Sequence, residues 1–188
     1  MGGTPVQYVR PRAGRVVAMA ANETPANEVV IAPVQGEGDL ASALAIREIV
    51  FIEEQRVPEG LERDAEDAKA FHVLAYEGKH AIGTGRLVVL SKPPQGERGK
   101  WGQIGRMAVL ATWRRRGVGR RVLQSLEDEA KHRKLEGIVL HAQLYARDFY
   151  RALGYHDASP IFEEAGIPHV EMRKPLWIQP PSGPAEVY

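Results

Sequence analysis

A short stretch with three arginines and two glycines, Arg114-Arg115-Arg116-Gly117-Val118-Gly119, constrains the fold of this chain more than any other feature. It lies between an apolar run at residues 104–110, which predicts a strand, and a long amphipathic pattern, which predicts a helix. Glycines let a ligand approach the backbone, and the first N–H groups of a helix have no partner within it. Because the helix dipole and the arginines favour negative charge there, the stretch predicts an anion site for a pyrophosphate. The alternative to an anion site is a solvated basic turn that opens a surface helix and binds no ligand.

The helix after this stretch is expected to pack one face on a sheet. Its apolar residues recur at four-residue spacing and are Val118, Val122, Leu126 and Ala130, with Leu123 beside them. The residues expected on its solvent face are Arg120, Arg121, Glu127, Lys131 and Arg133. We expect Gly137 to end the helix and residues 138–140 to form a buried strand. A second helix, ending at Gly154, is expected to contain Gln143, Ala146, Phe149, Tyr150 and Leu153.

The rest of the chain extends this pattern to the order β-α-β-β-β-α-β-α followed by a pair of strands. Residues 28–34 predict a first strand, and Asp39 can cap a helix from residue 40 to about residue 55. We expect a hairpin at 70–76 and 81–90, an exposed connection at 91–100, a strand at 103–110 and the strand pair at 155–174. Residues 1–27 predict a disordered lead, in which Met19 is an alternative start to Met1, and residues 177–188 predict a tail.

Composition narrows the class of protein. A chain of 188 residues with 44% apolar residues has room for one ordinary core, so we expect a single soluble domain at residues 28–176. The net charge of +1 gives no general reason to expect nucleic acid or an anionic membrane, and no apolar run approaches the roughly 20 residues that span a bilayer. The absence of cysteine excludes disulfides and a thiolate nucleophile, and is compatible with the cytoplasmic location that we expect.

Two longer segments carry a family resemblance. "RMAVLATWRRRGVGRRVLQSLEDEA" and "VLHAQLYARDFYRALGY" resemble the acetyl-coenzyme A binding core of the GNAT superfamily of N-acetyltransferases. The signature of that core is Gln or Arg, two variable residues, Gly, one variable residue, then Gly or Ala, and Arg114, Gly117 and Gly119 fill it. "VFIEEQRVP" and "FEEAGIPHVEM" further resemble an ElaA-like bacterial subgroup of the superfamily. The resemblance covers residues 28–176.

The resemblance implies a fold, a reaction and a set of coenzyme contacts. The fold is α/β, with a mixed, mostly antiparallel central sheet flanked by helices. The reaction is direct attack of an amine on acetyl-coenzyme A in a ternary complex, without a metal or a covalent enzyme intermediate. A strand formed by Met107, Ala108 and Val109 would offer backbone groups to the pantetheine arm, and an N–H near Val109 would polarise the thioester carbonyl. The other implied contacts are Arg114, Arg115, Arg116, Gly117, Val118, Gly119, Arg120 and Gln143, where the family more often has Asn.

Three residues are candidates for proton transfer. Tyr150, seven residues after Gln143, stands where the family places a tyrosine near the sulfur, and a phenol can return a proton to a leaving thiolate. The alternative for Tyr150 is a packing role. Glu54 is a candidate base, and the alternative is a solvated carboxylate at a helix end. His169 is also a candidate base, and the alternative is a histidine with a structural role. A coenzyme-binding sensor or interaction module without catalysis is the alternative for the whole chain.

The acceptor is left open by the sequence. We expect a small-molecule amine, with a protein amine as the alternative, and the sequence leaves open a homodimer. Nucleic acid is not expected, because no aromatic residues are interleaved with the arginines. No pair of histidines has the spacing of a zinc site, so no metal is expected. The loop at residues 56–69 carries five acids, Glu59, Glu62, Asp64, Glu66 and Asp67, and is interpreted as too polar to be buried. Its negative charge suggests the hypothesis that the loop steers a cationic acceptor toward the site. The alternative is that the loop is only a solvated surface.

Overall fold

The computed structural model describes residues 28–176, so the predicted lead, the tail and the choice of start lie outside the described residues. The helices are α1 (Gly36–Arg47), the π-helical η1 (Glu48–Glu54), α2 (Glu59–Glu62), η2 (Ala111–Trp113), α3 (Val118–His132), η3 (Leu144–Ala146) and α4 (Arg147–Arg151). The strands are β1 (Val29–Pro33), β2 (Phe71–Glu77), β3 (His80–Val89), β4 (Trp101–Val109), β5 (Gly137–Gln143), β6 (His156–Asp157), β7 (Phe162–Glu164) and β8 (Ile167–Pro175).

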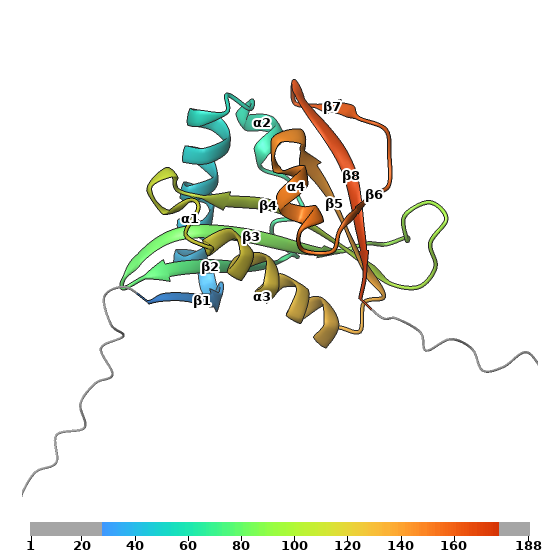
Figure 1. The fold of residues 1–188 in the computed structure, drawn as a ribbon. Coiled ribbons are helices and arrows are strands. Elements are labelled where there is room, and N and C mark those ends of the chain that lie inside the picture. The colour runs from blue at the N-terminus through green and yellow to red at the C-terminus, as the bar shows by residue number, and fades with distance from the viewer. Residues whose placement is uncertain (1–27, 177–188) are drawn as a thin grey trace, which may run out of the picture.

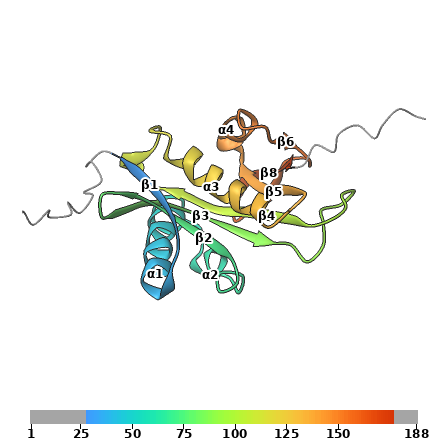
Figure 2. The same cartoon turned by 90° about the horizontal axis from the view of Figure 1, so that it is seen from below.

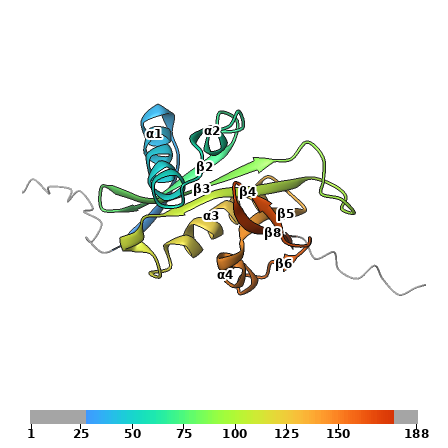
Figure 3. The same ribbon diagram turned by 90° about the horizontal axis from the view of Figure 1, so that it is seen from above.

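The strands form one sheet with the order β1-β2-β3-β4-β5-β8-β6, and β7 pairs with β8 (Figure 1). The β4–β5 pair is parallel and the other pairs are antiparallel. Helices α1 and α2 cover one face of the sheet, and α3 and α4 cover the other (Figures 2 and 3). The predicted fold class, a mixed and mostly antiparallel sheet flanked by helices, is therefore confirmed.

Helix α3 packs on the sheet as its periodicity predicts. Val118, Val122, Leu126 and Ala130 are buried together with Leu123 in the main core. Glu127 is also buried, so its expected place on the solvent face is wrong. Its carboxylate accepts hydrogen bonds from the hydroxyl of Tyr155 at 3.0 Å and from Nζ of Lys174 at 2.8 Å. These hydrogen bonds and the positive charge of Lys174 offset the cost of burying the carboxylate.

Gly137 does not end α3. The helix ends at His132, and Lys134 then takes a left-handed backbone conformation with φ of 57°. Gly137 is instead the first residue of β5, where it pairs with Trp101 of β4. A Cβ atom at this position would overlap the ring of Trp101. The glycine is therefore needed for close packing of two strands rather than for a helix end.

Other predicted boundaries differ at element ends. Helix α1 begins at Gly36, before Asp39, whose carboxylate accepts a hydrogen bond from the backbone N–H of Gln35 at 2.8 Å. Gln143 is the last residue of β5 and not part of a helix, because η3 and the short α4 begin after it. The expected C-terminal strand pair is three strands, β6, β7 and β8. The predicted hairpin is confirmed as β2 and β3.

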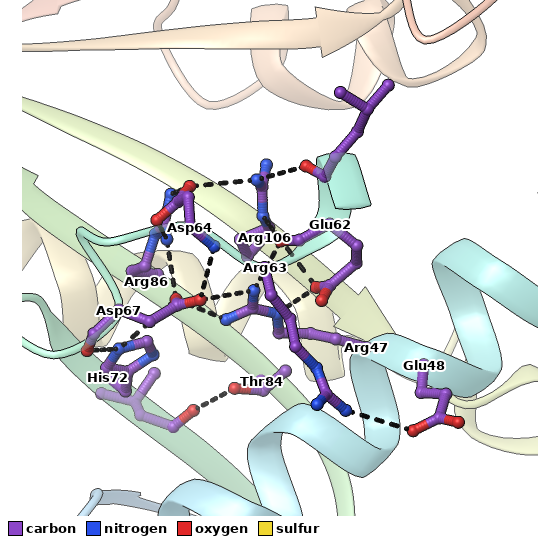
Figure 4. Close-up of polar contacts among 12 residues, drawn as sticks. Arg47, Glu48, Glu62, Arg63, Asp64, Asp67, His72, Thr84, Arg86 and Arg106 are labelled. Carbon is purple, nitrogen blue, oxygen red and sulfur yellow. Dashed lines mark hydrogen bonds and ion pairs between the residues drawn. The ribbon is translucent and has the colours of Figure 1, made fainter. Parts of the chain in front are cut away.

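The acidic loop is not the fully exposed segment that its polarity predicts. Glu62 is 2% exposed and forms an ion pair with Arg47, which is fully buried at 0%. The same guanidinium donates to both carboxylate oxygens of Asp67, at 2.7 and 3.0 Å, and to the carbonyl of Glu62 at 2.9 Å (Figure 4). A buried charge is tolerated when it is paired and hydrogen-bonded, and here Arg47 of α1 supplies the pairing.

Two arginines of the sheet complete this buried ion network. Arg86 of β3 donates to Asp64 at 2.6 and 2.9 Å and to Asp67 at 2.7 Å, and Arg106 of β4 donates to Asp64 at 3.1 Å (Figure 4). Three of the five carboxylates of the loop are thus matched by three arginines. The hypothesis that the loop steers a cationic acceptor loses the charge on which it depends.

Candidate active site

Strands β4 and β5 separate and leave a cleft in the sheet. They pair only at Trp101, Gly102 and Gln103, opposite residues 137–139. Beyond Gln103, β4 has no strand partner on its β5 side within residues 28–176, so that edge is free to meet a ligand. The cleft opens into a cavity of about 380 Å³.

The cavity wall is formed by residues of several elements, including β4 and β5, the segments α2 and η3, and the β7–β8 hairpin. Its apolar residues include Phe51, Leu61, Ile104, Met107, Leu140 and Ile167. Its polar residues include Glu62, Arg86, Arg106, His141, Gln143, Tyr145, Tyr150, Glu164 and His169. A mostly apolar hollow with a few convergent polar groups is the usual form of a small-molecule site.

A bulge in β4 shapes the floor of the cavity. Thr84 pairs with Ala108 but Arg86 pairs with Gly105, so β4 carries one extra residue. Arg106 lies in this bulge with φ of 54°, a strained conformation for a residue other than glycine. Its guanidinium donates to the carbonyls of Glu62 at 2.9 Å and Leu61 at 3.1 Å, which fixes the bulge against the buried ion network. Strain that is held by several contacts is typical of functional sites.

The predicted anion turn lies at the start of α3. Gly117 is the N-cap with φ of 79°, no side chain caps the helix, and a Cβ at Gly117 would meet nothing within 4 Å. The backbone N–H of Arg121 donates to the carbonyl of Gly117 at 3.1 Å, which leaves the N–H groups of the first helical residues without intrahelical acceptors. Arg114, Arg115 and Arg116 are exposed beside them. Open space, unsatisfied donors and positive charge fit the diphosphate of a coenzyme A molecule.

One arginine of this turn already has partners. The guanidinium of Arg114 donates to the carbonyl of Val109 at 2.8 Å and to the carboxylate of Glu54 at 2.5 Å. Glu54, a predicted base, is the last residue of η1 and does not line the cavity. Its carboxylate thus contacts the anion turn in this structure.

A chain of side-chain hydrogen bonds crosses from η1 to the other wall of the cleft. Nε2 of Gln143 donates to Oε1 of Gln55 at 2.9 Å, and Nε2 of Gln55 donates to the hydroxyl of Tyr145 at 3.3 Å. Oε1 of Gln143 is buried without a hydrogen-bond partner. A buried polar atom without a partner is unusual in a native fold and leaves a position for a ligand donor. Gln55 and Tyr145 were not predicted, because the contact joins residues 88 and 90 positions apart.

Tyr150 of α4 lines the cavity and is 8% exposed. Its ring meets those of Phe149 and Tyr155 edge to face, with centroids 4.9 and 5.8 Å away. Burial, with a smaller contribution from nearby Tyr145, raises the pKa of Tyr150 well above its ordinary value. The phenol therefore stays protonated at neutral pH and can act as a proton donor.

Two histidines, from β5 and β8, also line the cavity. His169, a predicted base, is buried, and its Nδ1 donates to the carbonyl of Ile167 at 2.7 Å. His141 of β5 was not among the predicted site residues, but it lines the same cavity, and its Nδ1 lies 2.8 Å from Oε2 of Glu164. The ring of Phe162 contacts both, stacked on His169 and edge to face with His141.

The structure thus divides the predicted site residues into two groups. Met107, Gln143, Tyr150 and His169 line the cavity. The residues outside its wall are Glu54, Ala108, Val109, Arg114, Arg115, Arg116, Gly117, Val118, Gly119 and Arg120, which belong to the end of η1, the end of β4 and the start of α3. Residues 28–176 contain no group of three or more His, Asp or Glu side chains arranged for a metal ion. In the same part of the chain no helix has the length and apolar composition to cross a bilayer.

Comparisons with known proteins agree with this geometry. A family model described as an acetyltransferase (GNAT) domain matches residues 35–176. The uncharacterized protein YyaT of Bacillus subtilis is 38% identical over 143 residues, which cover 74% of this chain and 91% of YyaT. A solved structure of a candidate N-acetyltransferase from Lactobacillus plantarum has a TM-score of 0.69 and 29% identity, over 80% of this chain and 100% of that chain. The structure of Escherichia coli ElaA has a TM-score of 0.66 and 23% identity, over 78% of this chain and 99% of that chain. The family model and the 26% identity to the ElaA sequence over 137 residues confirm the predicted resemblance.

Proposed function

The chain belongs to the GNAT acetyltransferase family, and from this premise we propose that it is an N-acetyltransferase that transfers the acetyl group of acetyl-coenzyme A to a primary amine. One observation carries the proposal. The uncapped start of α3 and the free edge of β4 lead from an anion site to a cavity that contains a protonated phenol, Tyr150. We propose residues 28–176 as the acetyltransferase domain.

In this proposal the chain holds the coenzyme at three places. The N–H groups of Val118, Gly119 and Arg120 would bind the diphosphate, with the charge of the exposed arginines added. The free edge of Met107, Ala108 and Val109 would bind the pantetheine arm by backbone hydrogen bonds. The buried Oε1 of Gln143, which has no partner, would accept a hydrogen bond from the same arm.

Acetyl-coenzyme A supplies the acyl thioester, and the chain supplies orientation and proton transfer. The N–H of Val109 would donate to the thioester carbonyl and stabilise the charge that develops on its oxygen. Tyr150 would give its proton to the departing sulfur, because a phenol is protonated at neutral pH and the raised pKa of Tyr150 keeps it in that form. His169 would accept a hydrogen bond from the amine, because its Nδ1 proton is held by the carbonyl of Ile167 and its Nε2 is therefore an acceptor.

The proposal is tested by binding and by turnover. Acetyl-coenzyme A should raise the melting temperature, with stabilisation of about 2.7 kcal/mol at a hundredfold excess over Kd. A thiol-release assay with acetyl-coenzyme A and a panel of primary amines, among them cadaverine, glucosamine and phenylethylamine, should then find an acceptor. An unchanged melting curve at millimolar acetyl-coenzyme A would overturn the proposal. Binding without turnover of any amine would instead favour a coenzyme-binding sensor or interaction module.

A further inference from the structure

His141 is placed on the cavity wall with a carboxylate behind it. Its Nδ1 lies 2.8 Å from Oε2 of Glu164, the last residue of β7, which pairs with β8. The side chain of His141 is 34% exposed, so it faces the cavity and solvent at once. The ring of Phe162 packs edge to face on the imidazole at a centroid distance of 5.1 Å. The imidazole is therefore held by Glu164 at Nδ1, and the rest of the ring is accessible from the cavity and from solvent.

The pairing with Glu164 determines which ring nitrogen of His141 can accept a proton. An ionised carboxylate accepts hydrogen bonds and does not donate them, so Nδ1 carries the proton. In the neutral imidazole Nε2 then has a free lone pair. Glu171 of β8 also lies near the ring, but its Oε2 is 3.9 Å from Nε2, too far for a hydrogen bond. Glu171 is itself paired with Arg173 at 2.6 Å.

The two bases predicted from the sequence have less suitable surroundings. The carboxylate of Glu54 is paired with Arg114 at 2.5 Å. His169 is 8% exposed, and its Nδ1 contacts a neutral carbonyl, so a positive charge on its ring would have no counter-charge there. His141 has one, because the imidazolium formed when Nε2 takes a proton lies against Glu164. A buried charge without a partner is costly, whereas a paired and partly solvated one is not.

We propose that His141, oriented by Glu164, is the base that takes a proton from the ammonium form of the acceptor. The inference rests on the proposed function. In this step an N–H bond of R–NH3+ breaks and its proton bonds to Nε2 of His141, which leaves R–NH2 with a free electron pair and an imidazolium paired with Glu164. The imidazolium then returns the proton to water at the exposed edge of the ring. Glu164 is a positioning residue, because it acts through His141.

The first test uses the protein without an acceptor. Long-range proton–nitrogen NMR should show His141 as the Nδ1–H tautomer in the neutral ring. Glu164→Ala should lose that preference, whereas Glu163→Ala, a change at the exposed neighbouring residue, should keep it. An Nε2–H tautomer of His141 in the unaltered protein would overturn the inference.

The second test is the pH dependence of turnover with any of the three amines that reacts. His141→Gln should lower kcat/KM by about 10²-fold or more at neutral pH, while Kd for acetyl-coenzyme A stays the same. The loss should shrink as the pH approaches the pKa of the amine, because the amine is then largely in its neutral form and needs no base. His132→Gln is the matched control, since His132 is an exposed histidine 3.6 Å from Glu129. Equal kinetics of His141→Gln and the unaltered protein overturn this inference alone, whereas binding without turnover in the unaltered protein overturns the proposed function as well.

Discussion

The guanidinium of Arg114 and the carboxylate of Glu54 form an ion pair at 2.5 Å between residues 60 positions apart. The pair joins the turn before α3 to the end of η1. Both side chains are partly exposed, at 41% and 33%, so the free energy of the pair should be small, about 0.2–1 kcal/mol. Its significance is that the same guanidinium is a proposed contact for the coenzyme diphosphate.

Glu54→Gln should therefore tighten coenzyme binding, because Arg114 no longer has to exchange a carboxylate for a phosphate. The expected decrease in Kd for acetyl-coenzyme A is about twofold to fivefold by isothermal titration calorimetry, which corresponds to the free energy of such a pair. Glu53→Gln, at the exposed neighbouring glutamate, should have no effect. Weaker binding in Glu54→Gln would mean that Glu54 positions Arg114 for the phosphates.

Gly117→Glu should abolish the effect of acetyl-coenzyme A on the melting temperature, because it places a negative side chain at the anion site. Gly96→Glu is a matched control, since Gly96 has a similar positive φ of 84° and equally open space around its Cβ position. Both variants should lose stability by backbone strain of about 1 kcal/mol. Equal coenzyme affinities in the two variants would argue against the α3 turn as the diphosphate site.

Tyr150→Phe should lower turnover by about 10²-fold or more with nearly unchanged affinity for acetyl-coenzyme A, since the ring remains and the proton donor is lost. Burial raises the pKa of Tyr150, so the protonated form persists below and through the ordinary tyrosine pKa of about 10. No loss of rate from this group is therefore expected between neutral pH and that value. Tyr76→Phe, outside the cavity wall, is the control. A wild-type rate in Tyr150→Phe would assign the tyrosine a packing role.

Local patterns in the sequence predicted the elements well. The apolar face of α3, the strand β4 and the β2–β3 hairpin follow from periodicities of 3.6 and 2 residues, which depend on neighbouring residues alone. The α3 turn was likewise predicted from a short motif, and its open, uncapped geometry was found in the structure. The mixed, mostly antiparallel character of the sheet was implied by the family resemblance and not by these periodicities, and the strand order was not predicted.

Features that depend on distant partners were not predictable in the same way. The role of Gly137 depends on Trp101, and the burial of Glu62 and the pairing of Asp64 and Asp67 depend on arginines from α1, β3 and β4. A charge pattern gives no sign of such partners, so the loop resembled a solvated surface. His141 was missed as a base for the same reason, because Glu164 is 23 residues away and the two are brought together by β8, which pairs with both β5 and β7.

The buried ion network gives the fold a specific sensitivity to acid. Burial alone would raise the pKa of Asp67, but hydrogen bonds from Arg47 and Arg86 outweigh it and hold that pKa far below its ordinary value. The hydrogen bond from Arg86 is the main cause of the lowered pKa of Asp64. A carboxyl group whose pKa is lower in the folded state stabilises the fold above its unfolded pKa of about 3.9, and this stabilisation is lost as the pH falls through the folded value.

Asp67→Asn should accordingly destabilise the protein by about 3–5 kcal/mol at pH near 6, because it leaves Arg47 and Arg86 buried with too little counter-charge. The difference from the unaltered protein should shrink below a pH of about 4, where Asp67 of the unfolded chain begins to take up a proton while the folded carboxylate stays ionised. Urea denaturation at a series of pH values measures both effects. Glu66→Gln, at an exposed carboxylate of the same loop, should leave the curve unchanged. If Asp67→Asn and Glu66→Gln unfold at the same urea concentration near pH 6, the network does not stabilise the fold, and the loop is held to the sheet by its apolar contacts instead.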